Sequence, residues 1–325
     1  MVTKKYFFSV DWGTTNFRLR MVECPSQKVV EERVLENGGV KNLYYQWKNG
    51  GGSRRLIFLN FLKNQIEHLN VKMPADTPIL ISGMASSSLG LLELPYAELP
   101  FATNGENAIV SFIKPNGTIR FPIYLISGIK SETDVIRGEE TQLMGCMKGN
   151  GAHSGDQLYI FPGTHSKHIL VRDNKVVDFK TYMTGEIFGL LATKSVLGNS
   201  VKATGKRMGI KSRDSFSNGL KAAINGNLLN EAFQIRTNYL FKKISKENNF
   251  YYLSGLMIGT EIKNLLSKSY KEIVVVCGSS VYAYYKMAFE ILGISENIKI
   301  FSPGAADRLV IKGQYKILKN NIHIK

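Results

Sequence analysis

The sequence predicts an α/β protein with two domains, and three observations lead to this fold class. Its 325 residues exceed what one domain ordinarily holds, since domains run to about 100–200 residues. Short apolar runs alternate with segments of helical periodicity along the chain. A strand–turn–strand unit that carries Gly and Thr opens each half of the chain, first at residues 6–22 and again at residues 157–171.

Composition fits an ordinary globular protein and excludes several classes. Hydrophobic residues make up 44% of the chain, which is enough for two cores. Apolar runs fall short of the roughly 18–20 residues of a membrane helix, and the N-terminal apolar run is too short for a signal peptide. We therefore expect a cytoplasmic protein without a membrane partner. The three cysteines lie far apart and form no CxxC pair, so neither a zinc site nor a disulfide framework is predicted.

The formal charge of +16 suits either a nucleic-acid binder or an enzyme with anionic substrates. The lysines and arginines are scattered, and the densest stretch, residues 202–213, is typical of a solvated surface. No nucleic-acid-binding motif accompanies the charge. We therefore expect no nucleic-acid partner.

In the first half, apolar or alternating patterns predict strands at residues 6–10, 17–22, 28–35, 78–82 and 123–126. Helical spacing predicts helices at residues 54–69 and 138–147. Glycine-rich or polar composition predicts loops at residues 49–53 and 128–135. The Gly/Asn cluster at residues 149–151 predicts the boundary between an N-terminal domain, residues 1–149, and a C-terminal domain, residues 150–325.

In the second half, the same patterns predict strands at residues 157–161, 168–171, 175–179 and 273–277. Helices are expected to dominate residues 187–268. A further helix should follow the turn at residues 278–280 and run to residue 292. A last helix is expected at residues 305–318, where it would pack back on the N-terminal domain.

The first turn, residues 11–16, has the residue types of a phosphate-binding loop. Gly13 lets the backbone approach a ligand closely. The N–H groups of a tight turn, joined by the hydroxyls of Thr14 and Thr15, can hold an anion. Asp11 is suited to hold Mg²⁺ through water, because Mg²⁺ prefers oxygen ligands and keeps several waters. An ordinary hairpin turn would give the same pattern.

The second turn, residues 162–167, repeats this arrangement. Gly163 and Thr164 supply the same donors, and Lys167 offers a positive charge for a polyphosphate. A hairpin turn is again the alternative. Two such turns, each between strands and each opening one half, indicate phosphate binding more strongly than either does alone.

Two further segments carry candidate polar groups. Glu139 or Glu140 is suited to accept the proton of an attacking hydroxyl, although adjacent acids in a first helical turn are also favoured simply by the helix dipole. Residues 184–186 either contact a ligand or form a helix start in which Thr184 is the N-cap. Both alternatives remain open at this point.

Six segments taken together resemble the 2-dehydro-3-deoxygalactonokinase family, within the superfamily that includes hexokinase, actin and Hsp70. The segments are residues 11–16 with Arg18, 137–142, 162–167, 184–186, 254–259 and 276–280. They occur in order and span nearly the whole chain. The resemblance implies a two-domain actin-like ATPase fold (ribonuclease H-like) with a nucleotide cleft between the domains.

The resemblance also implies an activity and its site. The expected reaction is ATP-dependent phosphorylation of the terminal hydroxyl of 2-dehydro-3-deoxy-D-galactonate to the 6-phosphate, with Mg²⁺ held at Asp11 and Glu139 preferred over Glu140 as the base. The expected ATP-binding residues are Gly13, Thr14, Thr15, Asn16, Gly163, Thr164, His165, Ser166, Lys167, Gly255, Gly278 and Ser279. The expected substrate-binding residues are Ser82, Gly83 and Met84, with Arg18 and Arg137 as candidates for the cationic clamp on the sugar-acid carboxylate.

The sequence departs from the pattern of this superfamily at two places. The second turn carries His165 where an Asp is more usual, and the segment after Gly83 lacks an early aromatic residue. The alternatives are therefore a kinase of the same fold for another sugar or sugar acid, a non-catalytic nucleotide-binding protein, and a nucleic-acid binder indicated by charge alone. The sequence does not indicate an oligomeric state.

Overall fold

The computed structural model describes residues 5–69, 71–147, 155–203 and 208–321, and it confirms the α/β class. The chain divides into two compact units. The first comprises Met1–Ser154, Val171–Phe179 and Asp307–Lys325, and the second comprises Gly155–Leu170 and Lys180–Ala306. The boundary predicted at residue 149 lies outside the described residues. Within the described ranges, no helix is both long and apolar enough to cross a membrane.

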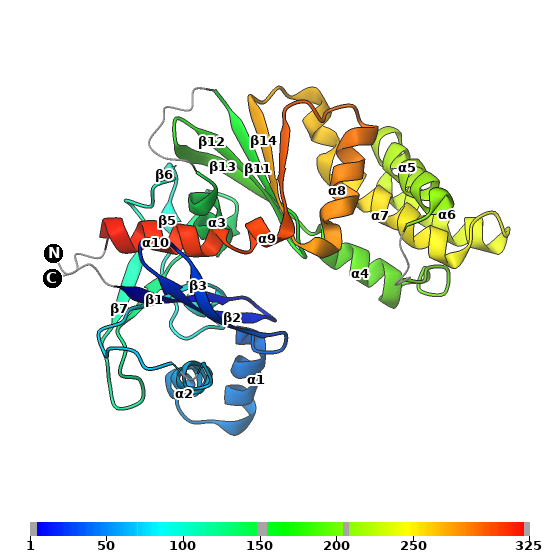
Figure 1. Cartoon of the computed structure of the whole chain (residues 1–325). Coiled ribbons are helices and arrows are strands. Elements are labelled where there is room, and N and C mark those ends of the chain that lie inside the picture. Colours follow the sequence, from blue (N-terminus) through cyan, green and yellow to red (C-terminus); the bar gives the residue numbers. More distant parts are fainter. Residues whose placement is uncertain (1–4, 70, 148–154, 204–207, 322–325) are drawn as a thin grey trace. The chain divides into compact units, whose positions relative to one another are not determined.

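The main sheet of the first unit contains six strands. They are β1 (Tyr6–Trp12), β2 (Phe17–Glu23), β3 (Val29–Leu35), β4 (Ile79–Gly83), β7 (Val110–Ile113) and β8 (Ile123–Ile126). Their order in the sheet is β3-β2-β1-β4-β8-β7. Because β1 pairs in parallel with β4 and antiparallel with β2, the carboxyl ends of β1 and β4 meet at one edge of a mixed sheet. Figure 1 labels β1, β2, β3 and β7 of this sheet.

The remaining elements of the first unit are mostly helices. They are α1 (Val40–Gly50), α2 (Arg54–Glu67), the 3₁₀ turn η1 (Met84–Ser86), α3 (Glu139–Cys146) and α10 (Leu309–Asn321). The short strands are β5 (Ala97–Glu98), β6 (Phe101–Ala102), β9 (Ile129–Lys130) and β10 (Val135–Ile136). Strands β10, β9 and β5 form a small second sheet. The loop predicted at residues 128–135 therefore contains β9 and begins β10.

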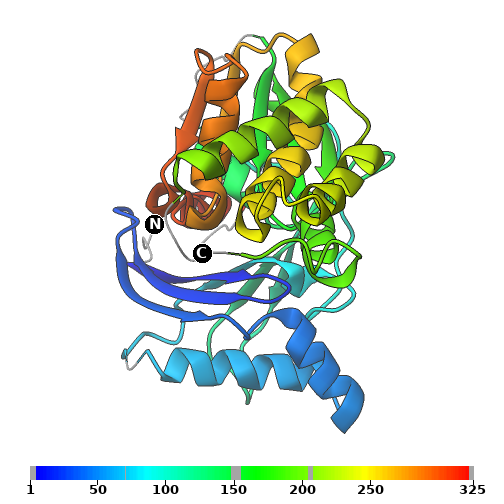
Figure 2. The ribbon, with the colours of Figure 1, turned by 90° about the vertical axis from the view of Figure 1, so that its right-hand side faces the viewer.

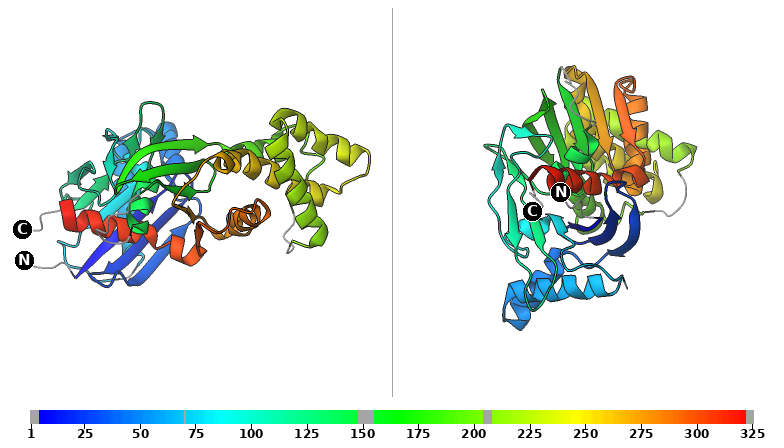
Figure 3. Two further views of the ribbon diagram at one scale, coloured as in Figure 1. Left: turned by 90° about the horizontal axis from the view of Figure 1, so that it is seen from above. Right: turned by 60° about the vertical axis from the view of Figure 1, so that its left-hand side comes forward.

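Helices cover both faces of the six-stranded sheet. On one face, Phe58 and Leu62 of α2 pack in the same core as Val10 of β1. On the other face, Ile311 of α10 packs with Phe7. Alternate residues of β1 thus enter different cores, as the pleat of a strand requires. Figure 3, right, shows α10 on one side of β1–β3 and the two N-terminal helices on the other.

Helix α1 was not predicted, although Val40, Leu43, Tyr44 and Trp47 stand at the spacing of an apolar helical stripe. Val40 and Leu43 are buried, and Tyr44 and Trp47 are half-buried. Its N-cap is a glycine, which has no side chain to accept a capping hydrogen bond. The loop predicted at residues 49–53 therefore begins two residues later than expected.

Helices α3 and α10 pack with their backbones close together, because glycine lies at the contact. A Cβ atom added to Gly313 of α10 would lie 1.9 Å from the carbonyl oxygen of Thr141. One added to Gly145 of α3 would lie 2.0 Å from the carbonyl oxygen of Leu309. The C-terminal helix thus belongs to the core of the first unit.

Replacing Gly313 with alanine should therefore force the two helices apart. We expect the free energy of unfolding to fall by about 1–3 kcal/mol, measured by urea denaturation. Gly50 is the matched control, because nothing lies within 4 Å of a Cβ at this helical position. Gly50→Ala should leave stability unchanged or raise it by about 0.5–1 kcal/mol. Equal effects of the two substitutions would contradict the close packing.

The second unit is built on five strands. They are β11 (Gln157–Phe161), β12 (Ser166–Arg172), β13 (Lys175–Tyr182), β14 (Glu272–Val276) and β15 (Ile298–Phe301). The sheet order is β15-β14-β11-β12-β13-β6. The tip of the β12–β13 hairpin groups with the first unit, where β13 pairs with β6. Strand β15 was not predicted; it is the edge strand of the sheet and is at most half-buried.

The helices of the second unit follow the predicted helical region. They are α4 (Thr184–Lys194), α5 (Ile210–Asn225), α6 (Leu228–Leu240), α7 (Lys246–Ile262), the 3₁₀ turn η2 (Lys263–Ser267), α8 (Ser279–Ile291) and α9 (Pro303–Ala306). Helices α5, α7 and α8 share one core with β11 and β14, and they gather on one side of these strands (Figure 2). A Cβ on Gly255 of α7 would lie 2.1 Å from the Phe216 carbonyl oxygen, so the backbones of α5 and α7 approach each other closely at this glycine.

Candidate functional site

The first turn, between β1 and β2, presents small polar side chains to solvent. The Gly13 N–H donates to the Asn16 carbonyl over 2.9 Å. The side chains of Thr14, Thr15 and Asn16 are exposed. The hydroxyls are therefore accessible to a ligand, as anion binding at a turn requires.

The N-terminus of α1 fixes the backbone of this turn. Three N–H groups at the start of α1 donate to three turn carbonyls: Val40 to Gly13 (3.0 Å), Lys41 to Thr14 (3.1 Å) and Gly39 to Thr15 (2.7 Å). A Cβ on Gly39 would lie 2.3 Å from the Thr14 carbonyl oxygen, so this approach requires glycine. Because the carbonyls of the turn are occupied, the turn has a defined shape before any ligand arrives.

The acid of this turn lies at the edge where β1 and β4 end. Asp11 stands directly beside Ser82 of β4. The Arg18 guanidinium donates from Nη1 to Asp11 Oδ2 over 3.2 Å. Gly83 has a φ of 91°, and a Cβ there would lie 2.8 Å from the Trp12 carbonyl oxygen. Asp11, Arg18, Ser82 and Gly83 therefore form one group within the first unit.

Helix α3 begins at the same edge. Gly138, with a φ of 104°, precedes the helix, and a Cβ on it would lie 3.3 Å from the Cα of Gly83. Glu139, the first residue of α3, therefore starts beside the end of β4. Met84 follows Gly83 and is half-buried in η1. Residues far apart in sequence thus come together: Asp11, Ser82 to Met84, and Glu139.

The two adjacent glutamates have different surroundings. Glu140 is 1% exposed, and its carboxylate accepts hydrogen bonds from the Gly138 N–H (2.6 Å) and the Thr141 hydroxyl (2.9 Å). Burial, and next the charge of Glu139, raise the pKa of Glu140 from its usual 4.5 to about 7, although these hydrogen bonds lower it. Glu139 is half-buried. Glu139 is thus the more accessible carboxylate of the two.

The raised pKa of Glu140 predicts a pH dependence of stability. A carboxyl whose pKa is higher in the folded than in the unfolded state stabilises the fold when protonated, and this contribution is lost as pH rises from 4.5 to about 7. Over this pH range, the contribution of Glu140 to the free energy of unfolding falls by about 3 kcal/mol. Urea titrations give the free energy of unfolding at about pH 5 and about pH 8. Between these pH values it should decrease less for Glu140→Gln than for the wild type. Parallel decreases in the two proteins would contradict the raised pKa.

Arg137 is held rigidly in the same unit. Its Nη1 donates to Ser86 Oγ and its Nη2 to the Leu94 carbonyl, both over 2.8 Å. The guanidinium also lies 3.9 Å from the centroid of the Tyr96 ring, a cation–π geometry. Arg137 therefore ties the segment after β4 to the start of α3.

Gln314 of α10 is a site residue that sequence reasoning missed. Its side chain is fully buried, and its Nε2 donates to the Val10 carbonyl and to Ser82 Oγ, both over 2.9 Å. It thereby joins the carboxyl ends of β1 and β4. The available signal was a polar residue on the apolar stripe of α10, whose other members include Ile311 and Ile317.

The second turn, between β11 and β12, is exposed to solvent like the first turn. Gly163, Thr164 and His165 are exposed. His165 Nε2 lies 2.5 Å from Glu186 Oε2, and the largely buried Lys167 donates from Nζ to the His165 carbonyl over 2.7 Å. The histidine that replaces the more usual acid is thus paired with an acid of α4.

Helix α4 begins against this turn. The Glu186 N–H donates to the Thr164 carbonyl over 3.1 Å, and a Cβ on Gly185 would lie 2.6 Å from the Gly163 carbonyl oxygen. The N-cap alternative for Thr184 is wrong: the N-cap is Met183, and the Thr184 hydroxyl donates to Glu261 Oε2. The sequence could not reveal this partner, because it lies on another helix.

A mostly apolar pocket of about 210 Å³ opens beside the second turn. Its walls come from the turn and from α4, α7 and α8. The lining residues are Gly163, Thr184, Gly185, Phe188, Phe250, Ser254, Met257, Ile258, Ser280, Val281, Tyr284 and Tyr285. Apolar and aromatic walls with a few polar groups are typical of small-molecule sites. The sequence did not point to Phe188, Phe250 or Tyr285.

The predicted nucleotide contacts Gly255, Gly278 and Ser279 do not line this pocket, but residues next to two of them do. Gly278 is the exposed N-cap of α8, nothing lies within 4 Å of a Cβ there, and Ser279 is the first residue of the helix. The next residue, Ser280, lines the pocket. Gly255 is buried against α5, and its neighbour Ser254 lines the pocket instead.

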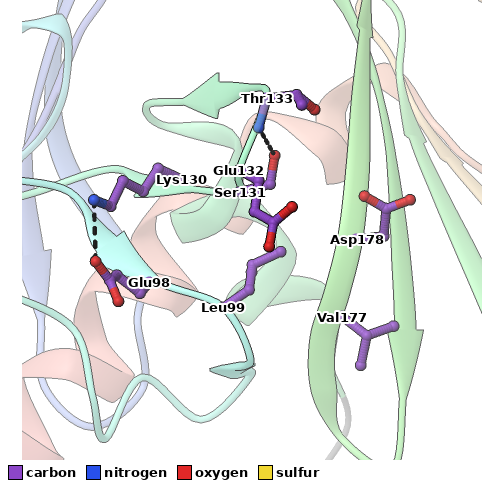
Figure 4. A pocket seen from close by; sticks show the side chains of 8 residues that line it. All are labelled: Glu98, Leu99, Lys130, Ser131, Glu132, Thr133, Val177 and Asp178. Atoms are coloured by element: carbon purple, nitrogen blue, oxygen red, sulfur yellow. Dashed lines mark hydrogen bonds and ion pairs between the residues drawn. The ribbon is translucent and has the colours of Figure 1, made fainter.

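A second pocket, of about 500 Å³, lies in the first unit (Figure 4). Its lining includes Glu98, Glu132 and Asp178, and Lys130 Nζ forms an ion pair with Glu98 Oε1 at 3.0 Å. No predicted site residue lines it. It is therefore separate from the group around Asp11.

The donor set fits magnesium bound mainly through a nucleotide. The described part of the chain holds no cluster of three or more His, Cys, Asp or Glu residues with metal-binding geometry. Mg²⁺ is usually bound by one or two carboxylates, several waters and substrate phosphates rather than by a protein cage. Asp11, partly exposed beside the first turn, meets that requirement.

Comparison with known proteins identifies the family. Residues 11–317 match the sequence model of the family described as 2-keto-3-deoxy-galactonokinase. The chain is 29% identical over 296 residues to the 2-dehydro-3-deoxygalactonokinase of Escherichia coli (strain K12), covering 88% of this chain and 90% of that protein. It is 31% identical over 310 residues to a candidate 2-dehydro-3-deoxygalactonokinase of Rhizobium meliloti (strain 1021), covering 91% and 92%.

Comparison with solved structures indicates the same family. A crystal structure of a candidate 2-dehydro-3-deoxygalactonokinase from Sinorhizobium meliloti superposes with a TM-score of 0.78 at 28% identity, covering 98% of this chain and 100% of that one. Sequence and fold thus agree over nearly the whole length of the chain. The chain belongs to the 2-keto-3-deoxy-galactonokinase family of sugar-acid kinases.

Proposed function

We propose that this protein transfers the γ-phosphoryl group of ATP to the terminal hydroxyl of 2-dehydro-3-deoxy-D-galactonate, giving the 6-phosphate. Membership of the family supports the reaction and the substrate. The observation that carries the proposal is the meeting of Asp11, Gly83 and Glu139 at one sheet edge, beside a turn with exposed hydroxyls. The actin-like two-domain arrangement with a nucleotide cleft is part of this proposal.

In the proposed reaction, the two turns hold the phosphates of one ATP molecule. Thr14, Thr15 and Gly13 would donate from the first turn, and Gly163 with Thr164 from the second. Phosphoryl transfer depends on positioning and charge neutralisation more than on covalent help. The hydrogen bonds from α1 and α4 support this role, because they fix both turns in advance. Mg²⁺ would be held by Asp11 together with the ATP phosphates, and it would neutralise charge on the transferred group.

Glu139 is the proposed base. It would orient the sugar hydroxyl and accept its proton, a contribution typically worth about 10²–10⁴ in rate. The occupied carboxylate of Glu140 supports this choice, because both of its oxygens already accept hydrogen bonds. Glu140 would instead anchor the start of α3.

The sugar acid would lie against the segment after β4. Ser82, Gly83 and Met84 are the proposed contacts for its hydroxyls. Arg18 and Arg137 are the proposed cationic groups for its carboxylate. Since both terminal nitrogens of Arg137 already donate within the protein, Arg18 would take the larger share by exchanging its contact with Asp11.

The apolar pocket in the second unit is the proposed site of the adenine ring. Its aromatic lining by Phe188, Phe250 and Tyr284 supports stacking against a flat base. Gly278 and Ser279 at the start of α8 would lie at the rim of this site. The second turn contributes Gly163 to the same pocket. With adenine bound there, this turn would contact the phosphates of the same nucleotide.

A coupled ADP-release assay tests the function directly. The purified full chain is given Mg-ATP and a panel of sugar acids that includes 2-dehydro-3-deoxy-D-galactonate, its gluconate epimer and neutral sugars. We expect the galactonate compound to stimulate ADP release most strongly. Greater stimulation by another sugar acid would identify a kinase of the same family with a different substrate. Nucleotide binding without stimulation by any compound would overturn the proposal in favour of a non-catalytic binder.

A further inference from the structure

A buried carboxylate lies beneath the second turn, and the proposed mechanism does not use it. Glu261 of α7 is 2% exposed. Its Oε1 lies 3.0 Å from His168 Nε2. Its Oε2 accepts hydrogen bonds from the Tyr285 hydroxyl over 2.7 Å and from the Thr184 hydroxyl. One side chain therefore contacts three elements, β12, α4 and α8.

The surroundings of Glu261 maintain it as an anion. Burial raises its pKa, but the hydrogen bond and charge of His168, with the hydroxyls of Thr184 and Tyr285, outweigh burial and lower it. An ionised carboxylate only accepts hydrogen bonds, so His168 Nε2 must be the donor. A buried charge is tolerated when donors surround it, and these three donors satisfy that condition.

Each of the three donors is adjacent to the proposed nucleotide site. His168 follows Lys167 of the second turn directly along β12. Thr184 lines the apolar pocket and precedes Gly185, whose backbone lies against Gly163.

Tyr285 also lines the pocket. Its pKa is raised well above the usual value by burial and by Glu261, while a hydrogen bond with Ser166 lowers it. The Ser166 hydroxyl in turn accepts from the Gly163 N–H over 3.3 Å. Tyr285, which donates to Glu261, thus lies close to Ser166, and Ser166 is itself bonded to the second turn.

We propose that Glu261 is a positioning residue that sets the affinity for ATP by fixing the second turn, the start of α4 and the pocket wall of α8 relative to one another. This inference rests on the proposed function, in which a nucleotide occupies that pocket. Glu261 lies under the site and is not among the residues that line it. Its effect would therefore pass entirely through His168, Thr184 and Tyr285.

Steady-state kinetics of Glu261→Gln separate positioning from a general structural role. Glutamine keeps the size of the side chain but offers one acceptor oxygen in place of two. We expect the KM for ATP to rise roughly tenfold, with kcat and the KM for the sugar acid within about twofold of the wild type. A lower melting temperature with an unchanged KM for ATP would overturn the inference.

Glu231→Gln is the matched control. Glu231 of α6 also accepts a hydrogen bond from a tyrosine hydroxyl of the second unit, that of Tyr252, over 3.2 Å. Neither Glu231 nor Tyr252 lines the pocket. Its replacement should leave the KM for ATP unchanged. A rise equal to that of Glu261→Gln would overturn the specific role of Glu261.

Two milder variants keep the test decisive if Glu261→Gln does not fold. Thr184→Val and Tyr285→Phe each remove one hydroxyl and retain most of the side chain. Each should raise the KM for ATP by roughly threefold, and their combined effect should differ from the product of the single effects, because they share one partner. Wild-type KM values for ATP in both variants would contradict the inference.

Titration calorimetry of the wild type with a non-hydrolysable ATP analogue separates this inference from the proposed function. If the wild type binds the analogue and Glu261→Gln binds it more weakly, the result supports both the proposed function and the role of Glu261. Equal binding by the two proteins overturns the role of Glu261 and leaves the function standing. Absence of binding by the folded wild type overturns both.

Discussion

Glu139→Gln is expected to lower kcat by about 10²–10⁴-fold, because glutamine cannot accept the proton of the sugar hydroxyl. Binding of ATP should stay close to that of the wild type, since the two turns do not depend on this side chain. Glu139 is half-buried at the first position of α3, and glutamine has nearly the same size and shape, so the variant should fold normally. The coupled ADP-release assay measures kcat, and calorimetry with an ATP analogue measures binding.

Glu140→Gln is the neighbouring control, with the same chemical change one residue along the helix. Its carboxylate already accepts from the Gly138 N–H and the Thr141 hydroxyl. We therefore expect a change in stability with a much smaller loss of kcat. A large loss in Glu140→Gln together with near-normal turnover in Glu139→Gln would assign the base to Glu140 instead.

Asp11→Ala is expected to lower kcat by about 10²–10³-fold, because it removes the carboxylate proposed to hold Mg²⁺ and so reduces stabilisation of the transferred charge. The concentration of Mg²⁺ needed for half-maximal rate should rise at the same time. Rates measured over a range of Mg²⁺ concentrations at saturating ATP and sugar acid test both points. Turnover like that of the wild type would refute the assignment of Asp11.

The loss of an ion pair alone does not account for the expected effect. Asp11 is paired with Arg18, and a comparable pair joins Arg20 Nε to Glu32 Oε1 at 2.6 Å in the same sheet. Glu32→Ala removes that acid at a position remote from the first turn. We expect its kcat to remain close to the wild-type value. A similar fall in both variants would indicate that the sheet, not the metal site, had been damaged.

Much of the fold could be predicted because its signals are local. Strands β1, β2 and β4 and the turn after β1 follow from a few consecutive residues, and so does the repeat of this unit at β11 and β12. Helix α2 shows its apolar spacing directly. The turn at Gly163 lies where it was predicted. The first turn is shorter than predicted, because Asp11 and Trp12 still pair within the sheet as the end of β1.

The remaining features depend on contacts between distant residues, which periodicity does not reveal. Gly39 looks like part of a loop, yet its lack of a side chain permits α1 to meet the first turn. Glu261 and Gln314 are polar residues on the buried faces of α7 and α10, and only the fold shows what they bind. A polar residue in such a position is a usable signal for future sequences, because burial without partners is costly.

The position of α10 has a consequence for synthesis on the ribosome. Gln314 of this last helix bonds to the ends of β1 and β4, and Gly313 packs against α3. Translation at about 5–20 residues per second reaches α10 roughly 10–30 s after α3 has been made. During that interval the face of the sheet that α10 covers, which includes Phe7 and Leu80, lacks its partner. We therefore expect nascent chains to need shielding at this face, and the order of synthesis to make the first unit the last to be completed.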